Sequence, residues 1–211
     1  MIAFARHLSL VVILLSFVCW SVPPTSAQQT DALKKQFLKY KAKAEKGDAK
    51  AQFMAGYCYY AGEGVEKDYV EAVKWYRKAA EQNYSEAQVM LAVCYAKGRG
   101  VDGDYVEAMK WYHKSAELNN FNAQFVLGGC YADGRGVNKD TVEAYAWFSL
   151  AAELSVRDAR QPGLEFREAV DARDKLEKQM SPQQVAEGRK RIRVLRALFP
   201  KLNTPRAYLE K

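Results

Sequence analysis

Three of the four cysteines would support redox or metal chemistry if they came together. Cys58, Cys94 and Cys130 follow one another at intervals of 36 residues, so no two have the short spacing of a zinc site. If they occupy the same place in successive packed helices, about 8–10 Å separates those helices. A disulfide tolerates roughly 7 Å between Cα atoms. We expect three buried, apolar thiols; a redox role or an intermolecular disulfide is the alternative.

A glycine-rich run, GRGVDG at residues 98–103, matches the spacing of a dinucleotide-binding loop. Such a loop needs a preceding strand, so that the helix after it points its N-terminus at the pyrophosphate. Here the preceding residues have helical periodicity, and the corresponding loops carry Lys67 and Lys139 at the third glycine. Asp102 and Asp104 lack the alternating ligands of a calcium loop. We predict no cofactor and no metal site.

Catalytic motifs are also missing from the sequence. His113 is the only histidine beyond the first ten residues, and neither Ser-x-x-Lys nor Gly-x-Ser-x-Gly occurs. The positions 36 residues before and after it hold Arg77 and Ser149, so we expect His113 to lie on the surface of a helix. We predict no catalytic residues and a protein that is not an enzyme. An enzyme would need a set of residues that no motif reveals.

The same interval of 36 residues organises the whole middle of the chain. Three copies of one unit are predicted, at residues 47–82, 83–118 and 119–154. The identities shared by all three copies are, in the first copy, Ala51, Gln52, Cys58, Tyr59, Gly62, Gly64, Val65, Asp68, Ala72, Trp75 and Ala80. So many coincidences at one offset indicate a repeat protein.

Each unit is predicted to be a helix, a tight loop and a second helix. Apolar residues recur in the first half at helical spacing, and Gly62 ends that helix because glycine tolerates the left-handed conformation. Asp68 and Glu71 predict a capping box at the start of the second helix. Asn83 and Asn119 follow it, where asparagine accepts a positive φ.

This pattern, Ala-Gln-x-x-x-Gly-x-x-Tyr-x-x-Gly-x-Gly-Val-x-x-Asp-x-x-x-Ala-x-x-Trp-Tyr, resembles the Sel1-like repeat of the tetratricopeptide-repeat superfamily. The departures are Ala92, Ser115 and Phe148. The resemblance implies an all-α, right-handed α-solenoid that mediates protein–protein interactions. Cysteine-rich members of the family, with two cysteines per repeat, are linked to β-lactam binding. That hydrolase alternative is weakened here by the single cysteine per repeat and the missing Ser-x-x-Lys.

The two ends of the repeat array are predicted to be caps. Residues 28–46 are predicted to form an N-terminal capping helix, in which residues 32–46 match the second helix of a unit. Residues 155–211 comprise a partial repeat, capping helices and a basic tail. Within the latter we predict helices over 164–179 and 182–199, with Ser181 as N-cap of the second. That last helix would turn Val185, Ile192, Leu195 and Phe199 inward and seal the stack.

The first 27 residues have the layout of a secretory signal peptide. Arg6 precedes the apolar run 8–20, and Ala27 ends a small-residue cleavage sequence. The apolar run is shorter than the ~20 residues of a membrane span. We expect cleavage after Ala27, a periplasmic or secreted protein, and no transmembrane segment after cleavage.

Two surfaces are candidates for binding. Successive first helices would form a concave face that holds a protein partner, through Lys50, Phe53, Tyr57, Tyr60, Glu86, Val89, Val93, Asn122 and Phe125. The alternative for Phe53, Val89 and Phe125 is packing between units. The last helix carries a basic patch for an acidic partner, anionic lipid or anionic polymer, formed by Arg189, Lys190, Arg191, Arg193 and Arg196. The alternative is a solvated face.

The formal net charge of +7 belongs mainly to that C-terminal region, which argues against a nucleic-acid groove along the whole protein. We therefore expect an exported, non-catalytic scaffold or adaptor. Its partner would belong to envelope signalling or assembly, or to a host. The alternative is a module that binds cell-wall or polysaccharide fragments through its aromatic residues.

Overall fold

The computed structural model describes residues 26–157 and 164–203. The predicted signal peptide, except for its last two residues, lies outside the described part, as do residues 204–211 of the basic tail. Residues 158–163, in the predicted partial repeat, lie outside it too. Within the described ranges no helix is both long and apolar enough to cross a membrane.

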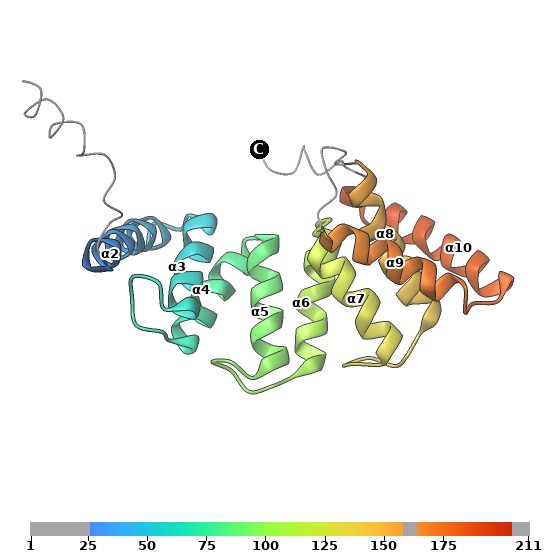
Figure 1. Ribbon diagram of the computed structural model, residues 1–211, viewed down its shortest axis with the longest axis horizontal. Coiled ribbons are helices and arrows are strands. Elements are labelled where there is room, and N and C mark those ends of the chain that lie inside the picture. Colours follow the sequence, from blue (N-terminus) through green and yellow to red (C-terminus); the bar gives the residue numbers. More distant parts are fainter. Residues whose placement is uncertain (1–25, 158–163, 204–211) are drawn as a thin grey trace, which may run out of the picture.

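All regular structure in the described residues is helical, which confirms the all-α solenoid. The helices are α2 (Ser26–Ala44), α3 (Ala49–Ala61), α4 (Tyr69–Glu81), α5 (Ser85–Lys97), α6 (Tyr105–Glu117), α7 (Phe121–Asp133), α8 (Thr141–Arg157), α9 (Leu164–Glu177) and α10 (Pro182–Leu198), followed by the 3-10 helix η1 (Pro200–Asn203). The pairs α3–α4, α5–α6 and α7–α8 form the three repeats, and each second helix packs on the first helix of the next unit. Figure 1 shows the pairs side by side, with α2 at one end and α9 and α10 at the other.

The helix starts confirm half of the predicted capping scheme. The Asp68 carboxylate accepts hydrogen bonds from the backbone N–H groups of Val70 and Glu71, at 2.9 and 3.0 Å. The predicted return bond from Glu71 is wrong, because its carboxylate pairs with Lys74 Nζ at 2.6 Å instead. A complete capping box is present at Ser181, at the start of α10.

The second glycine of each loop allows the loop backbone to lie directly on the second helix of the preceding unit. Gly100 has a φ of 74°, and a Cβ atom there would lie 2.2 Å from the carbonyl oxygen of Tyr69. Gly64 makes the same approach to Leu33 in α2. Leu33 precedes Tyr69 by one repeat length, so α2 takes the place of a second helix. This confirms the predicted N-terminal capping helix.

Large side chains from the second helices fill the space inside and between the units. Tyr76 is fully buried, and a Cβ atom on Gly56 would lie 2.8 Å from its ring. Phe148 lies against Gly128 in the same way. Small residues on the first helices therefore let the large rings of the second helices approach closely.

At the C-terminal end, α9 and α10 pack on two sides of α8 (Figure 1). The α9 residues Ala169 and Val170 join a cluster with Phe121 and Phe125. From α10, Ile192 and Leu195 are buried, and Val185 and Phe199 pack against the main core, as predicted. The helices predicted over 164–179 and 182–199 are confirmed to within two residues.

Candidate interaction surface

The three cysteines are buried and free, which confirms the expectation of apolar core thiols. Burial raises the pKa of the Cys94 thiol to about 11 and raises the pKa of Cys58 and Cys130 in the same direction. Because the thiolate is the reactive form of cysteine, these groups are both shielded and protonated. They belong to the packing of the first helices.

His113 lies between repeats, so the prediction of a surface position is wrong. Its Nε2 atom is 3.0 Å from the Tyr131 hydroxyl of α7, and its ring meets the edge of Trp147 of α8. Desolvation lowers the pKa of His113, and the charge of Arg191 lowers it further. One repeat earlier, the Arg77 guanidinium donates to the Tyr95 hydroxyl at 2.7 Å. This position therefore links adjacent units.

The glycine-rich run at 98–103 follows a helix, α5. Gly98 ends that helix with a φ of 60°. Within the described ranges, no group of three or more His, Cys, Asp or Glu residues is arranged to hold a metal ion.

The exposed sides of α3, α5 and α7 form what we call the first-helix face. The predicted residues Lys50, Tyr57, Glu86 and Asn122 are exposed there, and Phe53, Tyr60, Val89, Val93 and Phe125 are half-buried. Two half-buried methionines, Met54 and Met90, lie on the same helices and were not predicted. Their helical spacing from the predicted residues was the signal that would have included them.

Packing accounts for part of this face. The predicted packing between units is seen at Phe53, whereas the rings that Phe125 contacts belong to its own unit. The Phe53 ring lies 5.9 Å from Tyr76 and 5.3 Å from Tyr84 of the next unit, between ring centroids. The Phe125 ring stacks on Phe121 and packs against Phe148. Val89 packs against the main core.

Tyr60 is held by Arg99, which is not among the predicted binding residues. The Arg99 guanidinium donates a hydrogen bond to the Tyr60 hydroxyl and lies 5.5 Å from the ring centroids of both Tyr60 and Tyr69. The equivalent positions hold Glu63 and Arg135, so the repeat pattern does not mark this contact. Tyr57, with 38% of its surface exposed, is left as the accessible aromatic residue of α3.

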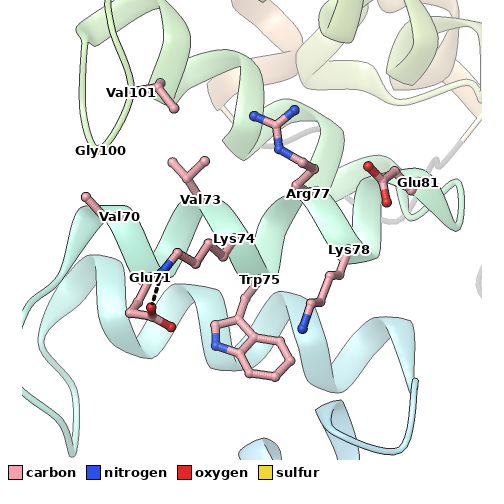
Figure 2. A pocket seen from close by; sticks show the side chains of 10 residues that line it. All are labelled: Val70, Glu71, Val73, Lys74, Trp75, Arg77, Lys78, Glu81, Gly100 and Val101. Atoms are coloured by element: carbon pink, nitrogen blue, oxygen red, sulfur yellow. Dashed lines mark hydrogen bonds and ion pairs between the residues drawn. The ribbon is translucent and has the colours of Figure 1, made fainter.

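The outward sides of α4 and α6 form what we call the second-helix face, which carries Glu71, Lys74 and Lys78 on α4 and Glu107, Lys110 and Lys114 on α6. An open groove of about 460 Å³ runs along α4 and the loop that follows α5. Figure 2 shows Val73 and Arg77 pointing toward that loop, and Trp75 pointing away from it beneath Lys78. The Lys78 ammonium lies 4.4 Å from the Trp75 ring centroid. Three cations, Lys74, Arg77 and Lys78, and two carboxylates, Glu71 and Glu81, line this groove, so both signs of charge are present.

The predicted basic patch on α10 is divided between two environments. Three of its arginines pair with carboxylates of the body: Arg189 with Glu177, Arg191 with Glu143, and Arg196 with Glu153. Lys190 and Arg193 are exposed. More than half of the predicted patch therefore attaches α10 to α8 and α9.

Comparisons with known proteins agree with this geometry. The family model described as Sel1 repeat matches residues 49–84, 85–120 and 122–156. These units begin two or three residues after the predicted boundaries. No curated protein sequence matches the chain.

Solved structures similar to the chain include the following two. One is a protective antigen present in uropathogenic Escherichia coli strains that displays an SLR fold, with 36% identity and a TM-score of 0.55. That match covers 70% of this chain and 34% of the antigen. The other is a Sel1 repeat protein from Oxalobacter formigenes, with 31% identity and a TM-score of 0.55, covering 67% of this chain and 64% of that protein. The chain thus spans about a third of the first and less than two thirds of the second.

Proposed function

Because this chain belongs to the Sel1 repeat family, whose repeats generally serve as protein–protein interaction scaffolds, we propose that it is an exported, non-catalytic scaffold. In this proposal the first-helix face is concave and holds a segment of a protein partner, from the envelope or from a host. The signal-peptide layout of residues 1–27 supports export.

The apolar character of the first-helix face is the observation that carries the proposal. α3 is apolar on nearly all sides, yet Tyr57 is exposed and Met54 is half-buried. The solvent-exposed side of α4 carries the charged residues Glu71, Lys74 and Lys78, and the exposed apolar residue Val70 lies at the start of that helix. A helix with apolar residues all round is normally covered on all sides, and an exposed apolar strip rimmed by polar residues is typical of a binding surface.

The rim of the face supports a protein partner over a polyanion. Lys50, Glu86 and Asn122 stand at the same position in the three units and differ in charge. A rim of mixed charge suits a partner that brings both polar and apolar side chains, with aromatic residues as anchors. The rigid, already packed rings of Phe53 and Tyr60 would lose little conformational entropy on binding.

Site-specific photocrosslinking in the producing cell tests the proposal. A photoreactive amino acid at position 57 samples the first-helix face, and one at Val106, which is exposed on α6, is the matched control. We expect a protein adduct from position 57 only. The partner, once identified and purified, should bind Tyr57→Glu at least about tenfold more weakly than the wild type, because a charge would replace an apolar contact. Equal affinity of Tyr57→Glu and Val106→Glu would contradict the proposal.

Two further measurements separate the parts of the proposal. N-terminal sequencing of the protein from the envelope fraction should begin at Gln28; a chain that keeps residue 1 would contradict export with cleavage. Tyrosine and tryptophan fluorescence should not change on titration with cell-wall fragments. Saturable quenching by fragments, without a protein adduct, would replace the scaffold with a polysaccharide-binding module.

A further inference from the structure

The C-terminal helix α10 is attached to the body by one side and by both of its edges. Its inner side buries Ile192 and Leu195 against α8. On one edge Arg191 pairs with Glu143 of α8, and on the other edge Arg196 pairs with Glu153. These contacts fix which side of the helix faces the solvent.

The outward side of α10 combines positive charge with apolar surface. At 100° per residue, Lys190, Arg193, Val194, Ala197 and Leu198 fall on one side of the helix, and all five are exposed. Val194 is 39% exposed and Leu198 is 61% exposed, the largest value among the exposed large apolar residues in the described ranges. We call this set the outer α10 face.

The outer α10 face carries more positive than negative charge, because the one acidic residue of α10, Glu187, is the single carboxylate of the helix on that side. The sequence has no acidic residue between Glu187 and Glu210. The carboxylates that α8 and α9 contribute to the region are paired with Arg189, Arg191 and Arg196. Lys201, in η1, is exposed beyond the end of the helix and extends the positive charge.

The second-helix face is different, although it is equally exposed. Lys74 pairs with Glu71, and Lys110 pairs with Glu107, each within one helix. Those pairs leave no net charge for a ligand to recognise. Glutamates match the outward lysines of α4 and α6 in number, whereas Lys190, Arg193 and Lys201 outnumber Glu187 on and beyond α10.

From this arrangement we propose that the outer α10 face docks on an anionic lipid surface. Lys190, Arg193 and Lys201 would lie at the level of the headgroups, and Val194 and Leu198 would enter the boundary with the acyl chains. A helix with cations beside large apolar side chains binds in this interfacial position, and each cation near an anionic leaflet adds to the attraction. An acidic protein or a soluble polyanion would have no use for the two large apolar side chains of this face.

The helix would lie parallel to the membrane plane. The opposite side of α10 is packed on α8, so the repeats would stand away from the lipid and the first-helix face would stay accessible. The docking would be weak and reversible, because three cations and two apolar side chains are few for stable anchoring. It would also be sensitive to salt, since exposed charges are screened within about 10 Å at 0.1 M.

Vesicle sedimentation with residues 28–211 tests the proposal, since this segment holds α2–α10 apart from the first two residues of α2. We expect binding to vesicles of phosphatidylcholine and phosphatidylglycerol at 7:3 in 0.1 M NaCl, and none to phosphatidylcholine alone. Lys190→Glu with Arg193→Glu should weaken the partition coefficient by at least about thirtyfold, the factor expected from the loss of two cations alone. Val194→Ser with Leu198→Ser should weaken it by about tenfold.

Matched variants on the repeats provide the controls. Lys74→Glu with Lys110→Glu makes the same change of charge on α4 and α6, and Val70→Ser with Val106→Ser removes equally exposed apolar groups. Neither should alter the partition coefficient. Far-UV circular dichroism and melting curves establish that every variant is folded.

Three outcomes would overturn the proposal. The first is no sedimentation of the folded wild type with the anionic vesicles, and the second is equal weakening by the control variants. The third is binding to soluble heparin and to vesicles that the Val194/Leu198 variant leaves unchanged, because this would assign the face to polyanions in general.

Discussion

The solvent-exposed sides of α4 and α6 and the corresponding side of α8 are built on the same repeat positions but differ in two of four residues. The four positions are Glu71, Lys74, Lys78 and Glu81 in α4; Glu107, Lys110, Lys114 and Glu117 in α6; and Glu143, Ala146, Leu150 and Glu153 in α8. The glutamates are kept in all three helices. The lysines of α4 and α6 become alanine and leucine in α8.

The covering helix α10 explains the difference. Ala146 is fully buried and Leu150 is only 3% exposed, because α10 packs over them. The two glutamates of α8 remain, but their partners are now Arg191 and Arg196 of α10. In α4, by contrast, Glu71 pairs with a lysine of its own helix.

In this chain, the same repeat position holds different residue types where the surface is covered and where it is exposed. At two of these four positions, the helices that face water carry lysine, and the helix under α10 carries an apolar residue. On this scale, the exposed Tyr57 and half-buried Met54 of α3 resemble covered positions, although within the described ranges no element covers them. That contrast supports the proposed partner on the first-helix face.

Exchanging equivalent residues between α6 and α8 should give the largest change in the free energy of unfolding. Leu150→Lys would place under α10 the residue that α6 carries, and we expect it to lower the free energy of unfolding by about 3 kcal/mol or more, because a buried ammonium has no partner there. The reverse change, Lys114→Leu, should cost less than about 1 kcal/mol, from the lost contact between Lys114 and the Trp111 ring. Urea unfolding measures both. Similar costs for the two variants would mean that α10 does not shield α8.

The close packing of Gly188 in α10 against Tyr145 in α8 should give the next largest change in stability. A Cβ atom on Gly188 would lie 2.5 Å from Cδ1 of Tyr145, so Gly188→Val should destabilise the protein by about 1–3 kcal/mol through overpacking. Ala186→Val, on the exposed side of the same helix, should cost about 0.5 kcal/mol from helix propensity. Thermal melting distinguishes them. A Gly188→Val protein as stable as Ala186→Val would contradict the close packing.

The ion pair between Glu143 and Arg191 should also be stronger than the ion pair between Glu71 and Lys74. In a double-mutant cycle, Glu143→Gln and Arg191→Met should show a coupling free energy of about 1 kcal/mol, because the Glu143 carboxylate is largely buried. The cycle for Glu71 and Lys74 should give a coupling close to the error of the measurement, because both side chains are exposed to solvent. Equal coupling energies would show that α10 does not alter the environment of the repeated glutamate.

The smallest expected effect is the contribution of His113 to the pH dependence of stability. The lowered pKa of His113 means that the unfolded chain takes up its proton first as the pH falls. The stability contributed by neutral His113 is therefore present above about pH 6.5 and is lost as the pH falls through that value toward the folded pKa. The urea midpoint should decrease from pH 8 to pH 6, and His113→Gln should reduce that decrease. An unchanged pH dependence in His113→Gln would place the titration elsewhere.

Much of the fold was predictable because its signals are local. Gly62 and Asp68 mark helix ends through their own backbone and side-chain preferences, and both preferences repeat with the unit. The buried cysteines followed from the helical spacing of their neighbours. The inward residues of α10, such as Ile192 and Leu195, followed from one apolar strip.

The candidate site was less predictable because its contacts join distant residues. The environment of His113 depends on Tyr131 and Trp147. The contact between Arg99 and Tyr60 joins two neighbouring repeats. The basic run of α10 looked continuous in the sequence, although three of its arginines are used within the molecule.

The amino-acid sequence by itself determined the repeat length, the helices and the residues that face the core, since each depends on periodicity and on local backbone preference. Only the tertiary structure decided which charges are neutralised and which remain for a ligand. Arg196 and Glu153, for example, are far apart along the chain. Their pairing depends on how α10 is placed on α8, and no interval in the repeat encodes that placement.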